Sequence, residues 1–150
     1  MSAYDNLKLD HQLCFALYAA THSLTRAYRC SLEPLGITYT QYLVMLVLWE
    51  TDGISVGKIA QRLELDSATL TPMLKRLEVA GFISRVRNQK DERIVEIKLT
   101  KIGHELQHQI AKVQEGVACQ TGLSTDEFGQ LKETLHRLVG TMSSAEAQPN

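Results

Sequence analysis

The chain has 150 residues, of which 44% are hydrophobic and 22% are charged, and it contains nine glycines and three prolines. This composition is typical of one folded soluble domain and excludes disordered and fibrous proteins. The longest apolar run, residues 42–49, covers eight residues, whereas a bilayer-spanning helix needs about 18. Residues 1–10 are polar and do not resemble a signal peptide. We therefore expect a cytoplasmic protein without a membrane segment.

The formal net charge of −1 is distributed unevenly along the chain. Residues 58–101 contain ten Lys and Arg side chains against six Asp and Glu, so this segment carries +4 and the rest of the chain −5. A basic middle segment within an acidic chain predicts a polyanionic partner for that segment.

The first two predicted elements are helices. Apolar residues recur at intervals of three and four over residues 13–32, which predicts an amphipathic helix with Asp10 as its N-terminal cap. The Pro-Leu-Gly sequence at residues 34–36 ends this helix. Residues 38–41 form a capping-box pattern, and the apolar run behind them predicts a second helix, through Trp49, that is buried on most sides.

The next two predicted helices are short and form a helix-turn-helix. After a turn at residues 52–53, Ser55 can cap the first of them, and Asp66 can cap the second. With Asp66 as the cap, Pro72 deletes a backbone hydrogen bond in the second turn. With Thr69 as the cap, Pro72 lies at an acceptable position, so this boundary stays open by about three residues.

A hairpin and two long helices complete the chain. Residues 83–87 and 93–99 have the alternation of strands and are joined by a polar tip. A long polar-faced helix is expected over residues 100–121, and a capping box at residues 124–127 opens a last, apolar-faced helix. Residues 143–150 are expected to be a frayed tail.

The order of these elements predicts a mainly α fold with a small β-hairpin wing: a winged helix-turn-helix flanked by N- and C-terminal dimerisation helices. We expect a single domain over residues 1–150, with a DNA-binding lobe at about 53–100 and dimerisation helices at about 10–34 and 100–141. The end helices carry more apolar positions than the lobe can cover, and a two-fold dimer would match two DNA half-sites.

The second short helix is expected to be a recognition helix, whose N-terminal half meets base edges and phosphates. Arg93, at the hairpin tip, is expected to enter a minor groove and to be held in place by Asp91. A solvated polar surface is the alternative for these side chains, but a hairpin following a helix-turn-helix favours double-stranded DNA. The predicted contact set is Ser67, Thr69, Thr71, Lys75, Arg76, Arg85, Arg87, Lys90, Asp91 and Arg93.

The three cysteines form no C-x-x-C pair, and their odd number fits neither a disulfide framework nor a zinc module. Cys14 and Cys30 lie sixteen residues apart on the predicted first helix, about 24 Å, whereas a disulfide needs Cα atoms within about 7 Å. An inert, buried thiol is one interpretation of Cys14. The other is a reactive thiol whose charged form accepts hydrogen bonds from the hydroxyls of Tyr28, Tyr39 and Tyr42.

Three segments resemble a known family: residues 13–18 (LCFALY), 36–50 (GITYTQYLVMLVLWE) and 70–78 (LTPMLKRLE). They are similar to the organic hydroperoxide resistance regulators, the OhrR branch of the MarR repressors. Residues 91–93 followed by 99–100 resemble the wider MarR signature. The resemblance covers residues 9–138, most of the chain.

The resemblance implies a homodimeric repressor, not an enzyme and without cofactor or metal, that binds operator DNA while Cys14 is reduced. In the family, an organic hydroperoxide oxidises this cysteine to a sulfenic acid, and two tyrosines, which Tyr28 and Tyr39 match by position, bond to its sulfur. Cys119 matches the cysteine of the other subunit that resolves the sulfenic acid as a disulfide. Cys30 matches no role in the family. Such a disulfide would shift the end helices and move the two recognition helices off a one-turn half-site spacing.

Three other interpretations stay open. A MarR-type repressor of the same fold could sense small aromatic ligands in a pocket, without thiol chemistry. A metal sensor would use His104 and His108, which share a helix face, and His11 one turn before Cys14. A thiol peroxidase would use the same cysteine but would need a surface on which a reductant docks.

Overall fold

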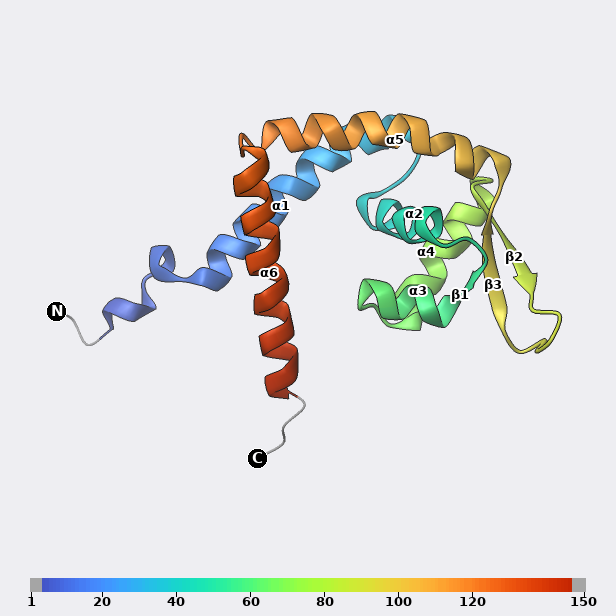
Figure 1. Cartoon of the computed structure of the whole chain (residues 1–150), viewed down its shortest axis with the longest axis horizontal. Helices are drawn as coiled ribbons and strands as arrows, with labels where there is room; N and C mark the ends of the chain where they lie inside the picture. Colours follow the sequence, from blue (N-terminus) through green and yellow to red (C-terminus); the bar gives the residue numbers. More distant parts are fainter. Residues whose placement is uncertain (1–3, 147–150) are drawn as a thin grey trace. The chain divides into compact units, whose positions relative to one another are not determined.

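The computed structural model describes residues 4–146 and is mainly helical (Figure 1). The chain divides into two compact units, Met1–Gln114 and Glu115–Asn150. The first unit holds the predicted winged helix-turn-helix, and the second holds the C-terminal helix. Within residues 4–146, every helix falls short of the length and apolarity that a membrane crossing requires.

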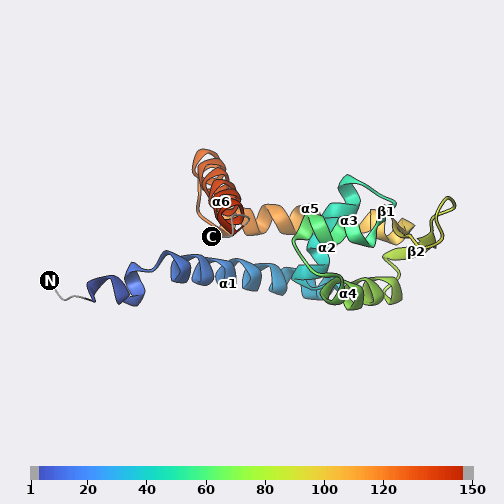
Figure 2. The same cartoon turned by 90° about the horizontal axis from the view of Figure 1, so that it is seen from below.

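Helix α1 spans Leu13–Leu32 and has the predicted bounds. The prediction that Asp10 caps it is wrong, because Asp10 lies inside a separate 3-10 helix, η2 (Leu9–His11), and Gln12 is the N-cap residue. A carboxylate two residues before the N-cap is too early to accept from the first free N–H groups of the helix. Within the first unit, the N-terminal half of α1 projects away from the remaining helices (Figure 2).

Helix α2 (Tyr39–Glu50) is the centre of the hydrophobic core. It follows a 3-10 helix, η3 (Glu33–Leu35), that ends at Gly36 with a φ of 77°. The predicted capping box is present: the Gln41 N–H donates to Thr38 Oγ1 at 3.3 Å, and the Thr38 N–H donates to Gln41 Oε1 at 2.9 Å. Six residues of α2 are buried, as its apolar run predicts: Gln41, Tyr42, Val44, Met45, Val47 and Leu48.

Helices α3 (Val56–Leu63) and α4 (Ser67–Val79) form the predicted helix-turn-helix. The side chain of Ser55 caps α3. Asp66 caps α4 and accepts a hydrogen bond at 2.7 Å from the backbone N–H of the third helical residue. This bond, with a second from the same residue's hydroxyl, holds the pKa of Asp66 below its usual value. The open boundary is therefore settled in favour of Asp66, and Pro72 lies inside α4.

The wing is part of a three-stranded antiparallel sheet with the order β1-β3-β2. Strands β2 (Ile83–Arg87) and β3 (Val95–Leu99) form the predicted hairpin. The third strand, β1 (Ile54–Ser55), was not predicted and pairs with β3. The prediction that the second strand starts at Arg93 is wrong by two residues, because Ile94 N–H bonds to a carbonyl within the wing tip.

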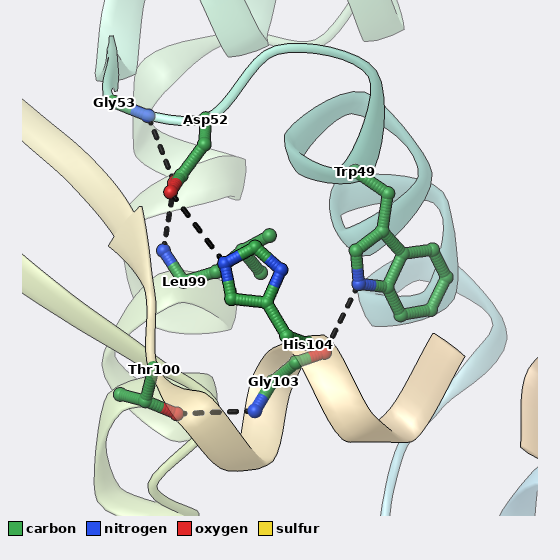
Figure 3. Close-up of polar contacts among 7 residues, drawn as sticks. All are labelled: Trp49, Asp52, Gly53, Leu99, Thr100, Gly103 and His104. Atoms are coloured by element: carbon green, nitrogen blue, oxygen red, sulfur yellow. Dashed lines mark hydrogen bonds and ion pairs between the residues drawn. The ribbon is translucent and has the colours of Figure 1, made fainter. Parts of the chain in front are cut away.

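Asp52 ties the turn after α2 to the sheet (Figure 3). Its Oδ1 accepts hydrogen bonds from the backbone N–H of Gly53, at 2.9 Å, and of Leu99, at 2.8 Å. Its Oδ2 lies 3.8 Å from Nε2 of His104, on helix α5 (Lys101–Gln120). One carboxylate thus joins three elements at the base of the wing.

The first turn of α5 is fixed to the same junction (Figure 3). Trp49 Nε1 donates to the carbonyl of Gly103 at 3.0 Å, and the Gly103 N–H donates to Thr100 Oγ1 at 3.1 Å. A Cβ atom at Gly103 would lie 2.1 Å from the carbonyl oxygen of Phe82. Glycine is therefore required here by close approach of two backbone segments.

In the second unit, α6 spans Thr125–Glu146. The predicted capping box is present: Ser124 N–H donates to Glu127 Oε2 at 2.8 Å, and Glu127 N–H donates to Ser124 Oγ at 3.3 Å. The first of these bonds lowers the pKa of Glu127. The predicted fraying is wrong for residues 143–146, which continue α6, and residues 147–150 lie outside the described residues.

Candidate functional site

Most of the exposed side chains of α4 are polar, as expected of a recognition helix. Its inner face is held in the core by Leu70, Leu74 and Leu77. Six polar residues of α4 are exposed: the five predicted, Ser67, Thr69, Thr71, Lys75 and Arg76, and also Glu78. The two threonine hydroxyls donate to the helix itself, from Thr69 to Asp66 Oδ2 at 3.0 Å and from Thr71 to the Ser67 carbonyl at 2.7 Å. Each hydroxyl therefore has only its lone pairs left for another partner.

The wing tip is ordered by side-chain to backbone hydrogen bonds. Asn88 Oδ1 accepts from the N–H of Lys90 at 2.8 Å and of Asp91 at 3.1 Å, and Asp91 Oδ1 accepts from the N–H of Arg93 at 3.0 Å. Asp91 thus fixes the backbone of Arg93 and leaves its guanidinium exposed. The backbone that carries the basic side chains of the tip is therefore held in a defined conformation, which suits contact with a duplex groove.

The predicted basic residues of the wing fall into two groups. Arg85 Nε lies 3.2 Å from Glu78 Oε2 and is therefore paired with α4. Arg87, Lys90 and Arg93 are exposed and form no ion pair with any of residues 4–146. These three side chains offer the unneutralised positive charge that phosphate contacts need.

Three tyrosines cluster where α1 meets α2. The ring centroids of Tyr28 and Tyr42 are 5.0 Å apart, and Tyr39 lies 5.4 Å from Tyr28 and 5.9 Å from Tyr42. Desolvation and the neighbouring Tyr28 phenol raise the pKa of Tyr39 and of Tyr42. Tyr39 and Tyr42 therefore keep their phenol protons to a higher pH than a free tyrosine, and a protonated phenol can donate a hydrogen bond.

All three cysteines are exposed in the chain. Cys14 lies at the start of α1 and Tyr28 fourteen residues later on the same helix, about 21 Å away at 1.5 Å per residue. The structure therefore does not bring Cys14 to the tyrosine cluster within one chain. Cys30 is on α1 as well, and Cys119 belongs to the second unit.

The histidines considered for metal binding come from two elements, since His11 is in η2 whereas His104 and His108 lie one turn apart on α5. Nδ1 of His11 is 2.9 Å from the Asp5 carbonyl oxygen, and His104 faces Asp52. Among residues 4–146, no group of three or more His, Cys, Asp and Glu side chains could hold a metal ion.

A pocket of about 530 Å³ lies beside the tyrosine cluster, between the C-terminal half of α1 and the start of α2. Its lining includes two arginines, Arg26 and Arg29, together with His22, Glu33 and Tyr39. Of these residues, only Tyr39 was predicted from the sequence as a site residue. The sequence shows that the two arginines and His22 are at helical spacing. It does not show that the chain turns back at Gly36 and so closes the pocket.

The raised pKa values make a prediction for alkaline pH. The folded state holds the phenol protons of Tyr39 and Tyr42 more tightly than the unfolded chain, whose tyrosines ionise near pH 10. This contribution to the free energy of unfolding is fully present below about pH 10 and is lost as the pH rises through the folded-state values. We expect urea unfolding midpoints to fall above pH 10, and to fall less in Tyr42→Phe. A midpoint that falls equally in both proteins would contradict the prediction.

A helix-turn-helix whose second helix is capped by Asp66, followed by a basic hairpin wing, defines the class of winged-helix DNA-binding regulators. The model of the transcriptional regulator family SarA/Rot matches residues 26–110. The chain is 42% identical to the organic hydroperoxide resistance transcriptional regulator of Bacillus subtilis (strain 168), over 93% of this chain and 95% of that protein. It is 46% identical to the HTH-type transcriptional regulator TtmR of Methylorubrum extorquens (strain PA1), over 91% and 74% of the two chains.

A solved structure of reduced AbfR bound to DNA superposes with a TM-score of 0.78 at 36% identity, covering 96% of this chain and 99% of that one. AbfR is a protein of Staphylococcus epidermidis. The chain thus belongs to the SarA/Rot family of MarR-type winged-helix transcriptional regulators, in the branch of the organic hydroperoxide resistance regulators.

Proposed function

We propose that this protein is a redox-switched repressor of the cytoplasm. Its reduced homodimer binds operator DNA through α4 and the wing, and oxidation of Cys14 by an organic hydroperoxide releases the DNA. The name of the Bacillus subtilis relative supports the inducer class. The AbfR structures support the switch, because they include reduced and overoxidised forms on DNA and a disulfide form.

The observation that carries this proposal is the placement of Cys14 and the tyrosine cluster at opposite ends of α1. Cys14, Tyr18, Thr21, Thr25 and Tyr28 share one face of the helix, at spacings of three and four. Two copies of α1, packed antiparallel with the two-fold axis near residue 21, bring Cys14 of one protomer beside Tyr28 of the partner subunit. Cys14 and Tyr28 lie about 21 Å apart in one chain, but Cys14 and Tyr28 of the partner subunit would lie side by side in this dimer.

The exposed apolar residues of α1 support the same arrangement. Leu13, Tyr18 and Leu24 are exposed by 63%, 62% and 39%, which is expensive unless another surface covers them. The same antiparallel register places Tyr18 opposite Leu24 of the partner subunit. We assign the regions of about 10–34 and 100–141 to dimerisation, and α6 contributes further exposed apolar side chains, including Phe128 and Leu131.

The proposed chemistry begins with the Cys14 thiolate. The hydroxyls of Tyr28 and Tyr39 of the partner subunit donate hydrogen bonds to the sulfur and favour its charged form. The thiolate attacks the terminal oxygen of the hydroperoxide, the O–O bond breaks, and the alkoxide leaves and takes a proton from water. The products are a Cys14 sulfenic acid and an alcohol, so the cysteine loses two electrons and the peroxide gains them.

Cys119 is the proposed resolving residue. Its thiol attacks the sulfenic sulfur of Cys14 in the other protomer, and a disulfide and one water molecule form. The covalent bond ties the end helices of the two protomers together in a new position. The two recognition helices then leave the spacing of one helical turn that adjacent half-sites require.

The DNA surface comprises the polar outer face of α4 and the basic wing. Lys75, Arg76, Arg87 and Lys90 are assigned to phosphates and base edges, and Arg93 to the minor groove beside the wing. The hydroxyl oxygens of Ser67, Thr69 and Thr71 are assigned to accept hydrogen bonds near the groove floor. Arg85 supports the wing through its ion pair with Glu78. Asp91 acts by positioning Arg93.

The test uses a duplex selected by the reduced wild-type protein from a pool with a randomised centre. Cumene hydroperoxide should release this duplex and yield a covalent dimer on a non-reducing gel, and dithiothreitol should reverse both effects. In Cys119→Ser the covalent dimer should be absent and the Cys14 sulfenic acid should persist, detectable with dimedone. A covalent dimer that forms equally in Cys119→Ser would assign resolution to Cys30 instead. DNA binding that survives complete disulfide formation would refute the switch.

A second candidate function is the sensing of a small ligand in the pocket beside Tyr39. The pocket volume of about 530 Å³ and the paired arginines, Arg26 and Arg29, favour an aromatic carboxylate as its occupant. Such a ligand would release DNA without any cysteine chemistry. The Cys14 variant discussed below separates the two candidates.

A further inference from the structure

The outermost line of α4 is apolar. Ala68, Pro72 and Val79 lie opposite the buried Leu70 and Leu74 at 100° per residue, and we call these three residues the apolar strip. All three are exposed, and Val79 is exposed by 82%. Pro72 and Val79 line a shallow groove of about 440 Å³ together with Lys75, Arg76 and Ala80. An apolar groove on the helix that faces DNA needs an explanation that polar contacts do not supply.

Pro72, one of the three residues of the apolar strip, lowers the stability of helix α4. It lies in the second turn of α4, where its ring nitrogen cannot donate to the Ala68 carbonyl. Proline inside a helix costs up to about 3 kcal/mol relative to alanine. The ring is exposed and therefore returns no burial energy in the free protein. Local sequence choices that work against the fold are expected where a surface has a function.

The neighbouring hydroxyls do not compete for base edges as donors. The hydrogens of Thr69 and Thr71 are already used in bonds to Asp66 and to the Ser67 carbonyl. Lys75 and Arg76 flank the groove on either side and carry the charge that draws it onto a polyanion. The groove is thus complementary to a surface that is apolar at its centre and negative along its edges.

We propose that the apolar strip reads thymine in the major groove through the C5-methyl group, which is the apolar feature of that groove floor. The inference rests on the proposed DNA binding and adds its sequence preference. The strip is about 16 Å long, from eleven residues at 1.5 Å each. It therefore spans about five base pairs, at 3.4 Å per pair. Each methyl that is buried against Pro72 or its neighbours adds about fourfold to the affinity, from about 0.8 kcal/mol per buried carbon.

The experiment replaces thymine by deoxyuridine, which lacks only this methyl group, in the selected duplex. The change is made one position at a time and symmetrically in both half-sites, with reduced wild-type protein. At the positions that the strip reads, we expect a loss of about 15-fold for the symmetric pair, and elsewhere in the duplex no change. Pro72→Ala and Val79→Ala, which keep or improve helix propensity, should weaken binding to the thymine duplex only. Lys75→Ala should weaken binding to both duplexes equally.

Two results would overturn the inference. Equal affinity for the thymine duplex and for fully deoxyuridine-substituted DNA would show that no methyl group is read. Equal weakening of both duplexes by Pro72→Ala would show that methyl readout, if present, comes from other residues. Failure of reduced wild-type protein to bind any duplex is a different result, because it refutes the proposed function as well.

Discussion

Cys14→Ser is expected to bind the selected duplex as tightly as the wild type and to keep it in the presence of cumene hydroperoxide. A serine hydroxyl is nearly the size of the thiol but does not ionise near neutral pH, so it does not attack the peroxide. The wild type should lose at least tenfold in affinity under the same treatment, about 1.4 kcal/mol. Fluorescence anisotropy of the labelled duplex measures both affinities.

Cys30→Ser is the matched control. Cys30 is exposed on the same helix as Cys14, but at about 100° per residue it lies about 160° round α1 from Cys14, on the face opposite the proposed antiparallel pairing. This variant should respond to the hydroperoxide like the wild type. Release that persists in Cys14→Ser would transfer the sensing role to the pocket lined by Arg26 and Arg29.

Gly103→Ala is expected to destabilise the first unit by about 2–4 kcal/mol, in the range of substitutions that overpack a rigid site. The added methyl would lie 2.1 Å from the Phe82 carbonyl oxygen and 3.3 Å from a methyl of Leu99. A backbone oxygen cannot move away as the end of a flexible side chain can, so α5 must shift and its bond from Trp49 must lengthen. Urea unfolding followed by Trp49 fluorescence measures the change.

Gly57→Ala controls for the general effect of replacing a helical glycine. Gly57 lies in α3, is exposed, and a Cβ there has no heavy atom within 4 Å. Its replacement should leave stability unchanged or raise it by up to about 1 kcal/mol, through helix propensity alone. If Gly103→Ala were as stable as Gly57→Ala, the close approach to Phe82 would not limit the position of α5.

Local signals in the sequence were sufficient for most element boundaries. The capping boxes at Thr38 and Ser124 involve residues three apart, so their bonds form wherever a helix forms. Strand β1 was missed because its two residues carry no periodicity of their own and become a strand only by pairing with β3. Asp10 was misassigned because the turn that precedes α1 has no local mark that separates it from the helix.

The candidate site was less accessible to sequence reasoning. The tyrosine cluster was anticipated, and its separation from Cys14 follows from the rise of about 1.5 Å per residue over a helix whose bounds the sequence predicted, but the two were expected to meet within one chain. The apolar strip has no hydrogen-bonding side chain, so the pattern of polar and basic residues that predicts DNA contact does not include it. The role of Asp52 depends on Leu99, 47 residues away, and such pairs become visible only in the folded chain.

The junction around Asp52 and Gly103 makes the beginning of α5 part of the lobe that carries the wing. The bond from Trp49 Nε1 to the Gly103 carbonyl, the bond from the Gly103 N–H to Thr100 Oγ1 and the close approach of the Phe82 backbone fix the orientation of this first turn relative to the lobe. We therefore expect a rotation of α5 to turn β2 and β3 together with it, because these contacts hold the start of the helix against the sheet. Because Arg93 lies at the tip of the β2–β3 hairpin, far from the start of α5, we expect a small rotation of α5 to displace Arg93 by a larger amount than the base of the hairpin.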